Sequence, residues 1–277
     1  MITENKKSIQ KGSIIHEDDA ACVQIVGCDP EIMAEAAKIS EGMGAKIIDI
    51  NFGCPAKKIV GSYAGSALMR NEKLAGQIIE AVVHAVKLPV TLKMRTGWDE
   101  TNRNAPALAK IAESAGIQMI TVHGRTRSQF YRGTSDWEFI KEVKKVIKIP
   151  VIVNGDIVSC ATAKEALIKS GADGIMVGRG TYGKPWLLAQ IMHYLNTGQI
   201  QSAPPKNIHV DTILTHYQSI LDYYGIDIGI KIARKHLGWY SKGMPNASDF
   251  RAKVNCLNNH IEVVKLIKES MHHSLLT

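Results

Sequence analysis

Short apolar segments alternate with longer helix-forming segments over the first two thirds of the chain, and two phrases within this alternation are near-copies. Residues 86–90 read VKLPV and residues 147–151 read IKIPV, and each phrase leads into an apolar segment. Repeated strand–helix units at this spacing are typical of a parallel sheet, and strands that are apolar on both faces fit a sheet covered by helices. The alternation therefore predicts an α/β fold.

The expected strands lie at residues 22–26, 47–50, 90–94, 119–123, 151–154 and 174–177, and the expected helices between them at 30–41, 74–86, 105–114, 137–147 and 161–170. Polar residues cluster at the carboxyl ends of these strands: Gln24, Asn51 with Cys54, Lys93 with Arg95, His123 with Arg125, Asn154 with Asp156, and Gly178 with Arg179. In a (β/α)8 barrel such ends surround one active site, whereas a doubly wound sheet gathers ligand residues at a single switch point. We therefore expect a TIM-barrel type fold, incomplete because six strands are found where the closed barrel has eight.

The strand pattern stops after residue 185, and the remainder is predicted to form helices at residues 207–224, 227–240, 245–257 and 258–273. This predicts an incomplete barrel over residues 1–197 and a small all-helical domain over residues 206–277, joined by a linker at 198–205. On an ideal helix, four cations fall within about 100° of arc. They are Lys231, Arg234, Lys235 and Lys242. Two explanations stay open here, a solvated helix face and a surface for an RNA backbone.

The formal net charge of +8 suits a polyanionic partner and equally suits a set of solvated lysines. Five cysteines without paired spacing argue against a disulfide framework and for a reducing compartment, so the cytoplasm is the expected location. No Cys/His cluster has the spacing of a zinc site, and no metal is expected. The N-terminus lacks the apolar core of a signal peptide, and no run of about 18 apolar residues predicts a membrane span.

Cys54 stands apart from the other cysteines because it lies between a glycine and a proline just after an apolar strand. Pro55 cannot continue a strand and Gly53 permits unusual backbone angles, so the thiol is expected at the mouth of the strand instead of in the core. The usual interpretation of a cysteine, a small core hydrophobe, is kept for the others. These are Cys22, Cys28, Cys160 and Cys256.

Two glycine-containing loops follow the last two expected strands, as Asn154-Gly155-Asp156 and as Gly178-Arg179-Gly180, and the second is expected to open the next helix. Glycines let main-chain amides approach a phosphate, and the loops after the last two strands of a barrel frequently form a phosphate site. Lys93 ends an apolar strand and needs an anionic partner, either a ligand or a carboxylate such as Asp49. His123 is either a structural imidazole or a ligand contact. The fingerprints of hydrolases and of dinucleotide-binding folds are absent from the sequence.

Taken in order, these segments resemble the bacterial tRNA-dihydrouridine synthases, and most nearly their B-type branch. The similar segments are Gln24, NFGCP at 51–55, AGSAL at 64–68, KMR at 93–95, HGRT at 123–126, NGD at 154–156, GRG at 178–180 and RKHLGWY at 234–240. The resemblance implies an FMN-bearing TIM barrel followed by a helical RNA-binding domain. By this resemblance the FMN-binding residues are Gln24, Lys93, His123, Asn154, Gly155, Asp156, Gly178 and Arg179, and the expected RNA-binding residues are Arg95, Arg125, Lys231, Arg234, Lys235 and Lys242.

The implied reaction is the reduction of uridine to 5,6-dihydrouridine in tRNA, with NADPH as the reductant. Reduced FMN would deliver a hydride to C6 of a uracil that is flipped out of the RNA, and Cys54 would protonate C5 as the general acid. A free thiol ordinarily titrates at about pH 8.5, so it carries a proton at neutral pH. Lys93 and His123 would offset the negative charge of the reduced flavin.

Family members begin with two strands that have no counterpart before residue 22, so a truncated or degenerate barrel with exposed sheet edges is expected. Two alternative functions stay open. One is a catalytically impaired, truncated copy that retains tRNA binding, which the missing strands favour. The other is a different FMN-dependent TIM-barrel oxidoreductase that acts on a small molecule, and the basic helical segment counts against it.

Overall fold

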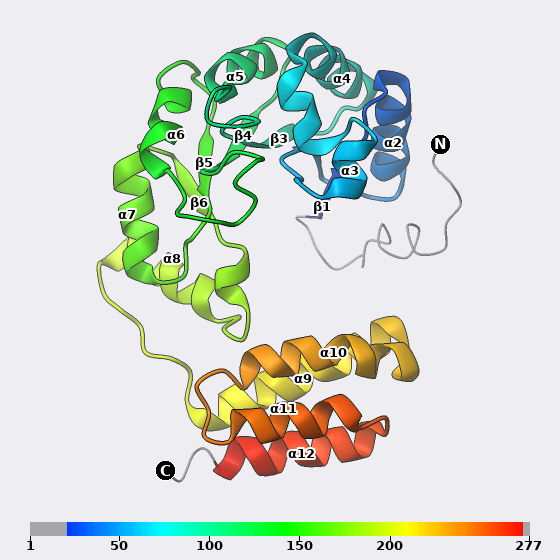
Figure 1. Cartoon of the computed structure of the whole chain (residues 1–277), viewed down its shortest axis with the longest axis vertical. Coiled ribbons are helices and arrows are strands. Elements are labelled where there is room, and N and C mark those ends of the chain that lie inside the picture. Colours follow the sequence, from blue (N-terminus) through cyan, green and yellow to red (C-terminus); the bar gives the residue numbers. More distant parts are fainter. Residues whose placement is uncertain (1–20, 274–277) are drawn as a thin grey trace. The chain divides into compact units, whose positions relative to one another are not determined.

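The computed structural model describes residues 21–273, and in them six parallel strands form a single sheet (Figure 1). The strands are β1 (Cys22–Ile25), β2 (Ile47–Phe52), β3 (Val90–Arg95), β4 (Met119–His123), β5 (Val151–Asn154) and β6 (Gly174–Met176). Each strand pairs with the next one along the chain, so among the described residues β1 and β6 have a partner on one side only. A sequential order without a switch point is the arrangement of a (β/α)8 barrel, and the predicted incomplete TIM-barrel type fold is confirmed.

Helices connect the strands and lie along the outer side of the sheet (Figure 1). They are α2 (Pro30–Gly42), α4 (Glu72–Ala85), α5 (Ala105–Ser114), α6 (Trp137–Lys144) and α7 (Cys160–Ser170). Asp29, Asn71 and Asp136 precede α2, α4 and α6, and each side chain accepts a hydrogen bond from a main-chain amide of the first turn. Such caps satisfy amides that have no partner inside the helix, which explains why these helices begin where they do.

The near-copied phrases occupy equivalent places in two strand–helix units. Glu41, at the end of α2, accepts a hydrogen bond from the amide of Lys87 at 3.0 Å, and Glu113, at the end of α5, accepts one from the amide of Lys148 at 2.6 Å. In both copies the proline that follows accepts a hydrogen bond at 3.0 Å from an amide of the neighbouring strand. The repeat in the sequence therefore reflects a repeated way of tying the turn before a strand to a preceding helix.

The core of this part of the chain consists of apolar side chains from the strands and from the inner faces of the helices. Ile48, Ile50 and Phe52 of β2 are fully buried, as are Leu92 and Met94 of β3. The buried helical side chains include Ile78, Ile79 and Val82 of α4 and Leu108 of α5. Because helices cover the outer face of the sheet and the central strands are buried, the polar residues at the ends of these strands are positioned by a rigid framework.

The chain divides into two compact units between Val177 and Gly178. The first takes in the chain up to Ile157 together with Ala161–Val177, and the second takes in Gly178 onward together with Val158–Cys160. The predicted boundary at residues 198–205 falls later in the chain than this division and stays a prediction.

The second unit is helical, as predicted. It contains η2 (Arg179–Thr181), α8 (Leu187–Thr197), α9 (Lys206–Tyr224), α10 (Ile226–Tyr240), α11 (Ala247–Cys256) and α12 (His260–His273). Side chains from α9 to α12 form its core, and Tyr217, Leu237, Phe250 and Ile267 are all buried there.

Two expectations from the sequence need correction. Short elements between β2 and α4, namely α3 (Lys57–Gly61) and η1 (Gly65–Arg70), were not predicted, and neither was α8. Gly178 was expected to open a helix, but the structure has only a 3₁₀ turn at Arg179–Thr181. Gly183, with a φ of +72°, and Pro185 interrupt the chain there, so a regular helix begins only at Leu187.

Candidate active site

The carboxyl ends of the strands bring polar residues of the first unit to one edge of the sheet. In the sheet register Asn51 pairs with Lys93, while Arg95, His123 and Asn154 form a row across β3, β4 and β5. Neighbouring strands lie only about 4.8 Å apart, so residues in register are side by side. The strand ends therefore gather these residues as expected, while their roles as ligands stay predictions.

A chain of hydrogen bonds runs from the buried Asp49 to Cys54. The Asp49 carboxylate accepts hydrogen bonds from Thr91 Oγ1 and from Gln24 Nε2, both at 2.6 Å. Gln24 Oε1 accepts a hydrogen bond from Asn51 Nδ2 at 2.8 Å. Asn51 Oδ1 in turn accepts from the main-chain amide of Cys54 at 2.9 Å and from that of the preceding residue at 3.0 Å. The carboxylate thus sets the orientation of both amide side chains, and Asn51 holds the loop that carries the thiol.

The Cys54 loop is also held from η1. The carbonyl of Cys54 accepts hydrogen bonds from the amide of Ser66 at 3.1 Å and from Ser66 Oγ at 2.8 Å. Gly65, with a φ of +60°, packs so closely that a Cβ there would lie 2.9 Å from the Cys54 carbonyl oxygen and 3.2 Å from Cys54 Cβ. Two sides of the loop are therefore fixed, and the thiol itself is free and half-buried.

The interpretation of the other cysteines as core hydrophobes is wrong. Cys22 and Cys256 are exposed, and Cys28 and Cys160 are half-buried. Cys22 lies on β1, at the edge of the described sheet, and Cys256 is the last residue of α11. Positions at an edge or an element end leave even an apolar side chain in solvent, which the residue type alone does not reveal.

Arg95 joins two loops at this edge of the sheet. Its Nε donates to the carbonyl of Gly53 at 2.9 Å, and its Nη1 donates to the carbonyls of Thr126 and Phe130 at 2.8 and 2.9 Å. Burial lowers the pKa of the Arg95 guanidinium to about 10, so it remains charged at neutral pH. A guanidinium has five donors in a fixed plane, which suits it to bridging carbonyls of separate loops.

Lys93 and His123 lie at the same edge with polar atoms that have no partner. Among residues 21–273 the Lys93 ammonium has no hydrogen bond or ion pair, so the alternative of a pair with Asp49 is not formed. Burial, and then the charge of Arg95, lowers the pKa of Lys93. His123 is 8% exposed, and its Nδ1 is buried without a hydrogen-bond partner among the same residues. Burial, followed by the charges of Arg95, Lys93 and Arg125, lowers the pKa of His123 to about 3, so the imidazole is neutral.

Arg125 and Asp156 form a bidentate ion pair beside His123. Arg125 Nη1 and Nη2 donate to the two carboxylate oxygens at 2.9 and 2.6 Å, and the amide of Ser135 donates to the same carboxylate at 2.8 Å. Arg125 also donates to the carbonyls of Arg132 and Gly133. Burial alone would raise the pKa of Asp156, but the hydrogen bonds from Arg125 and Ser135 outweigh it and the pKa is lowered.

These contacts bear on several predicted roles. Arg95 and Arg125 are 3% and 2% exposed and already hold loops of their own unit, so their predicted contact with RNA stays a prediction that their burial does not support. The Asp156 carboxylate is occupied by Arg125, and Gly155 is buried with its carbonyl accepting a hydrogen bond from Trp137 Nε1 at 2.9 Å, so the predicted ligand contacts of this loop stay predictions. Asn154 Nδ2 donates to the carbonyl of Met176 at 2.8 Å, which leaves its Oδ1 for a ligand.

Gly178 and Arg179 belong to the second unit, where Gly178 caps η2 and Arg179 opens it. Their predicted contact with a phosphate stays a prediction. Asp49, Thr91, Ser66 and Ser135 were not predicted as site residues. Asp49 carried the only signal of the four, as a carboxylate inside an apolar strand.

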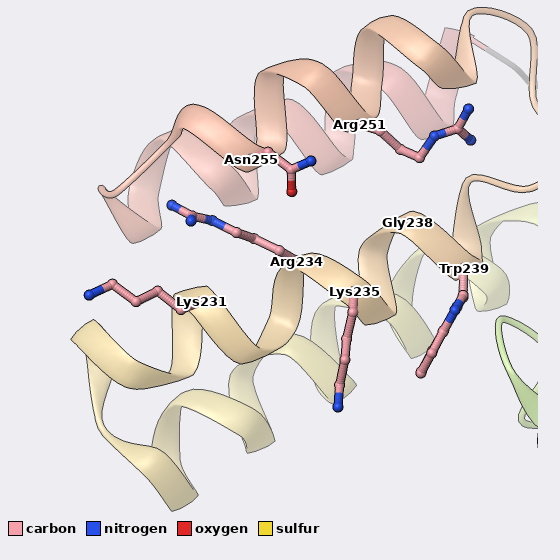
Figure 2. Close-up of a pocket in the computed structure, with 7 residues that line it drawn as sticks. All are labelled: Lys231, Arg234, Lys235, Gly238, Trp239, Arg251 and Asn255. Carbon is pink, nitrogen blue, oxygen red and sulfur yellow. The ribbon is translucent and has the colours of Figure 1, made fainter.

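A basic pocket lies between α10 and α11 of the second unit (Figure 2). It has a volume of about 450 Å³ and is lined by Lys231, Arg234, Lys235, Gly238, Trp239, Arg251 and Asn255. Three of the four predicted cations are among these residues. Lys242 is not, because α10 ends at Tyr240, and Arg251 was missed because it comes from a different helix.

The cations of this pocket differ in the interactions that they already make within the protein. Arg234 Nη2 donates to the carbonyl of Leu257 and to Asn258 Oδ1, both at 3.0 Å, and so ties α10 to the turn before α12. The Lys235 ammonium lies 5.9 Å from the centre of the Trp239 ring. The pocket lining contains no carboxylate, so its charge is available to an anion.

Metal-binding clusters and membrane-spanning helices are both absent from the described residues. In residues 21–273 no cluster of three or more His, Cys, Asp or Glu side chains has the arrangement to hold a metal ion. Among the helices of this part of the chain, none combines the length and apolar character that crossing a bilayer requires.

Comparison with known proteins adds independent evidence. A family model described as dihydrouridine synthase (Dus) matches residues 1–275. The probable tRNA-dihydrouridine synthase of Rickettsia conorii is 62% identical over 270 residues, which are 97% of this chain and 82% of the relative. The tRNA-dihydrouridine synthase B of Xanthomonas axonopodis is 47% identical over 250 residues, which are 90% of this chain and 75% of the relative.

Solved structures match in fold alone. D-glucarate dehydratase from Agrobacterium tumefaciens has a TM-score of 0.50 and 17% identity, over 69% of this chain and 48% of that one. The family model spans nearly the whole sequence, and the two relatives match this chain over most of their own length. The chain therefore belongs to the dihydrouridine synthase family, as the resemblance of its motifs predicted.

Proposed function

We propose that the protein reduces uridine to 5,6-dihydrouridine in tRNA, with FMN as its cofactor and NADPH as the reductant. The observation that carries the proposal is the half-buried thiol of Cys54, held in place at the edge of the sheet where Lys93 and His123 have polar atoms without a partner among the described residues. The names of the relatives support tRNA as the substrate. Reduction of the uracil C5–C6 bond requires a hydride donor and an acid, and the Cys54 thiol is the candidate acid at this edge.

The residues at this edge fit an anionic flavin. Lys93, Arg95 and Arg125 make the local charge positive, and the unpartnered Nδ1 of His123 can exchange a hydrogen bond with a polar ring atom. Gly155 is a proposed FMN contact through its main chain; its φ is +111°, and a Cβ there would collide with Ser135 Oγ and lie 3.2 Å from His123 Nε2, so the close packing of this loop requires glycine. When bound, FMN would supply the hydride that reaches C6 of the uracil. The other proposed FMN contacts are Gln24, Asn154, Gly178, Arg179 and the main chain of Asp156, whose carboxylate is held by Arg125.

The protein contributes the proton and the electrostatic environment. Cys54 donates a proton to C5 of the uracil, and its position is set by the hydrogen bonds from its amide to Asn51 and from Ser66 to its carbonyl. Lys93 is a cation without a competing carboxylate bond, so it can stabilise negative charge that develops during the reaction. His123 is neutral in the free protein, and an anion bound beside it would raise its pKa.

The basic pocket of the second unit is the proposed RNA-binding surface. Phosphate contacts from lysine and arginine provide most of the sequence-independent affinity of a protein for RNA. Lys231, Lys235 and Arg251 have free or weakly used charges, whereas Arg234 is partly engaged in holding the α11–α12 turn. Lys242 lies outside the pocket and remains a proposed contact on the turn after α10.

The first experiment tests the role of Cys54. We expect Cys54→Ala to keep its flavin absorbance and the reduction of the flavin by NADPH, and to form no dihydrouridine in tRNA. Cys28→Ala is the matched control, because Cys28 is also a half-buried cysteine in a loop after a strand of the first unit. Undiminished product from Cys54→Ala would exclude Cys54 as the acid.

The wild-type protein separates the alternatives to this proposal. A chain that binds tRNA but has no flavin absorbance and forms no product would support the impaired copy. A chain that contains flavin and reduces a small molecule, with no product in tRNA, would support the other class of oxidoreductase.

The second experiment tests the basic pocket. We expect Lys231→Glu and Lys235→Glu each to weaken tRNA binding and to reduce the slope of log affinity against log salt by roughly one per lost phosphate contact. Lys268→Glu is the control, because Lys268 is an exposed lysine on α12 that does not line the pocket. An unchanged affinity and salt slope in both pocket variants would show that this face is only solvated.

A further inference from the structure

Tyr63 combines a strained main chain with a side chain that is in solvent. Its φ is +58°, in the left-handed region that a bulky residue rarely adopts, and 71% of the residue is exposed. It lies between α3 and η1, in the segment that joins the Cys54 loop to the turn packed against it. A strained position normally persists because surrounding contacts require it, so the contacts of Tyr63 decide what the strain means.

The main chain at Tyr63 requires the left-handed conformation but not a tyrosine. The amide of Tyr63 donates to the carbonyl of Val60 at 3.0 Å, and the amide of Ala64 donates to the carbonyl of Ile59 at 3.2 Å. This pair of bonds is the Schellman motif that ends many helices, and Tyr63 occupies the position where glycine is strongly preferred. Glycine would meet the geometry at this position without strain, so the fold alone does not explain the tyrosine.

The Tyr63 side chain makes no specific polar or aromatic contact with the other described residues. Among residues 21–273 it takes part in no hydrogen bond, ring contact or cation–π contact. Two other residues with left-handed φ near the same edge of the sheet differ in this respect. Asp156 is held by Arg125 and Ser135, and Phe130 gives its carbonyl to Arg95.

Tyr63 lies close to the proposed acid. Gly65, two residues further along, packs against the main chain and Cβ of Cys54. Two residues span at most about 7 Å, so the main chain of Tyr63 lies within that distance of Gly65, at the border of the Cys54 loop. An exposed ring at the border of the loop that carries the proposed acid can contact the nucleotides next to the base that meets the thiol.

We propose that Tyr63 is a stacking platform for a nucleobase of the RNA substrate, next to the uridine that is reduced. This inference rests on the proposed function and adds a substrate-positioning residue to it. Unstacked bases of RNA are commonly received on aromatic side chains, and such stacking is tolerant of base identity. When the uridine leaves its stack to reach Cys54, its neighbour loses a stacking partner, and the Tyr63 ring replaces that partner.

The test compares Tyr63→Gly, Tyr63→Leu and Tyr63→Phe. Tyr63→Leu keeps an apolar side chain without a ring, and we expect its kcat/KM for tRNA to fall on the order of 10- to 100-fold. The loss should come mainly from KM, while reduction of the bound flavin by NADPH stays unchanged. Tyr63→Phe should restore kcat/KM to within about twofold of the wild type, because stacking needs the ring and not the hydroxyl. Ile168→Ala, at a residue of α7 that is 70% exposed, is the surface control.

Tyr63→Gly gives a readout that a merely structural role cannot produce. Glycine removes the left-handed strain, so we expect this variant to unfold at a higher temperature than the wild type while losing as much kcat/KM for tRNA as Tyr63→Leu. A simultaneous loss of stability and activity would instead indicate that the ring supports the loop, and would overturn the proposal.

A tRNA-binding measurement keeps this proposal separate from the proposed function. If the wild type forms no dihydrouridine, the proposed function fails, but weaker tRNA binding by Tyr63→Leu with recovery in Tyr63→Phe would still support the platform. If Tyr63→Leu binds tRNA as tightly as the wild type and any activity is equal, the platform is refuted. The exposed ring would then be assigned to another surface role, such as contact with a protein.

Discussion

The ion pair between Arg125 and Asp156 should be among the most stabilising polar contacts of the first unit. Arg125 is 2% exposed, the two N–O distances are 2.9 and 2.6 Å, and the Asp156 side chain is 32% exposed. The substitution Asp156→Asn removes the charge with little change in shape. Asparagine also tolerates the left-handed φ of +57° at this position, so backbone strain does not confound the result.

The size of the effect follows from what the substitution leaves behind. Removing one partner of a buried ion pair costs about 3–5 kcal/mol, because the remaining charge has no counter-charge. Arg125 would also remain among Arg95 and Lys93, which carry the same sign. The partial exposure of Asp156 lets water screen the pair, so the lower end of the range applies. We therefore expect Asp156→Asn to lower the free energy of unfolding of the first unit by about 3 kcal/mol.

Native-state hydrogen exchange is the appropriate assay, because the chain has two compact units and a single unfolding curve would mix them. A loss of 3 kcal/mol corresponds to a drop of roughly 100-fold in the protection of the amides of β4 and β5. Glu142→Gln is the control, because Glu142 and its partner Lys145 are 51% and 57% exposed and such pairs contribute less than about 1 kcal/mol. A drop of less than about fivefold in Asp156→Asn, equal to that of the control, would refute the assignment of a stabilising pair.

The ion pair between Arg125 and Asp156 also predicts that the free energy of unfolding depends on pH. The folded state lowers the pKa of Asp156 below its ordinary value of about 4. The stabilisation is therefore complete above that value and is lost as the pH falls through the lower pKa of the folded state. The difference in unfolding free energy between the wild type and Asp156→Asn should be largest at neutral pH and should shrink in acid, which denaturant unfolding at a series of pH values would measure.

Two further predictions concern the Cys54 loop and the buried imidazoles. Gly65→Ala should lower both the melting temperature and the rate of dihydrouridine formation, because the new Cβ would lie 2.9 Å from the Cys54 carbonyl oxygen at a φ of +60°; an unchanged rate would show that the loop position does not matter. Burial, before any charge, lowers the pKa of His123 to about 3 and that of His236 to about 4. Because the unfolded chain takes up these protons at about pH 6.5, stability should be greatest above that pH and should fall toward pH 4, and His123→Asn should flatten the fall in a pH series of unfolding free energies.

The fold was predictable because each strand is marked by a local pattern in the sequence. The six apolar runs are bounded by glycine, proline or charged residues, and their sequential spacing is enough to indicate the parallel order that the structure has. The helix α8 was missed for a related reason. Its buried side chains are Leu187 and Ile191, but Leu188 and Met192 on the same helix are exposed, so the apolar residues do not mark a single face.

The candidate site was predictable only in part, because a strand end specifies where a side chain lies and not which bonds it makes. Asn51, Lys93, His123 and Asn154 were expected at one edge of the sheet, and the register brings them there. The role of Asp49 depends on bonds to Gln24 and Thr91, residues 25 and 42 positions away, and no local pattern reports such distances.

The basic residues at the edge show most clearly what the sequence leaves undecided. Lys93 and Arg95 lie two residues apart on one strand, and charge alone suggested similar roles for them toward an anionic ligand or RNA. The guanidinium of Arg95 reaches three carbonyls on two loops, and these bonds occupy it inside the protein. An ammonium cannot bridge loops with the same fixed geometry, and Lys93 makes no hydrogen bond or ion pair among residues 21–273. The arginines at this edge therefore build the site, while the lysine and the neutral His123 are left to meet the ligand.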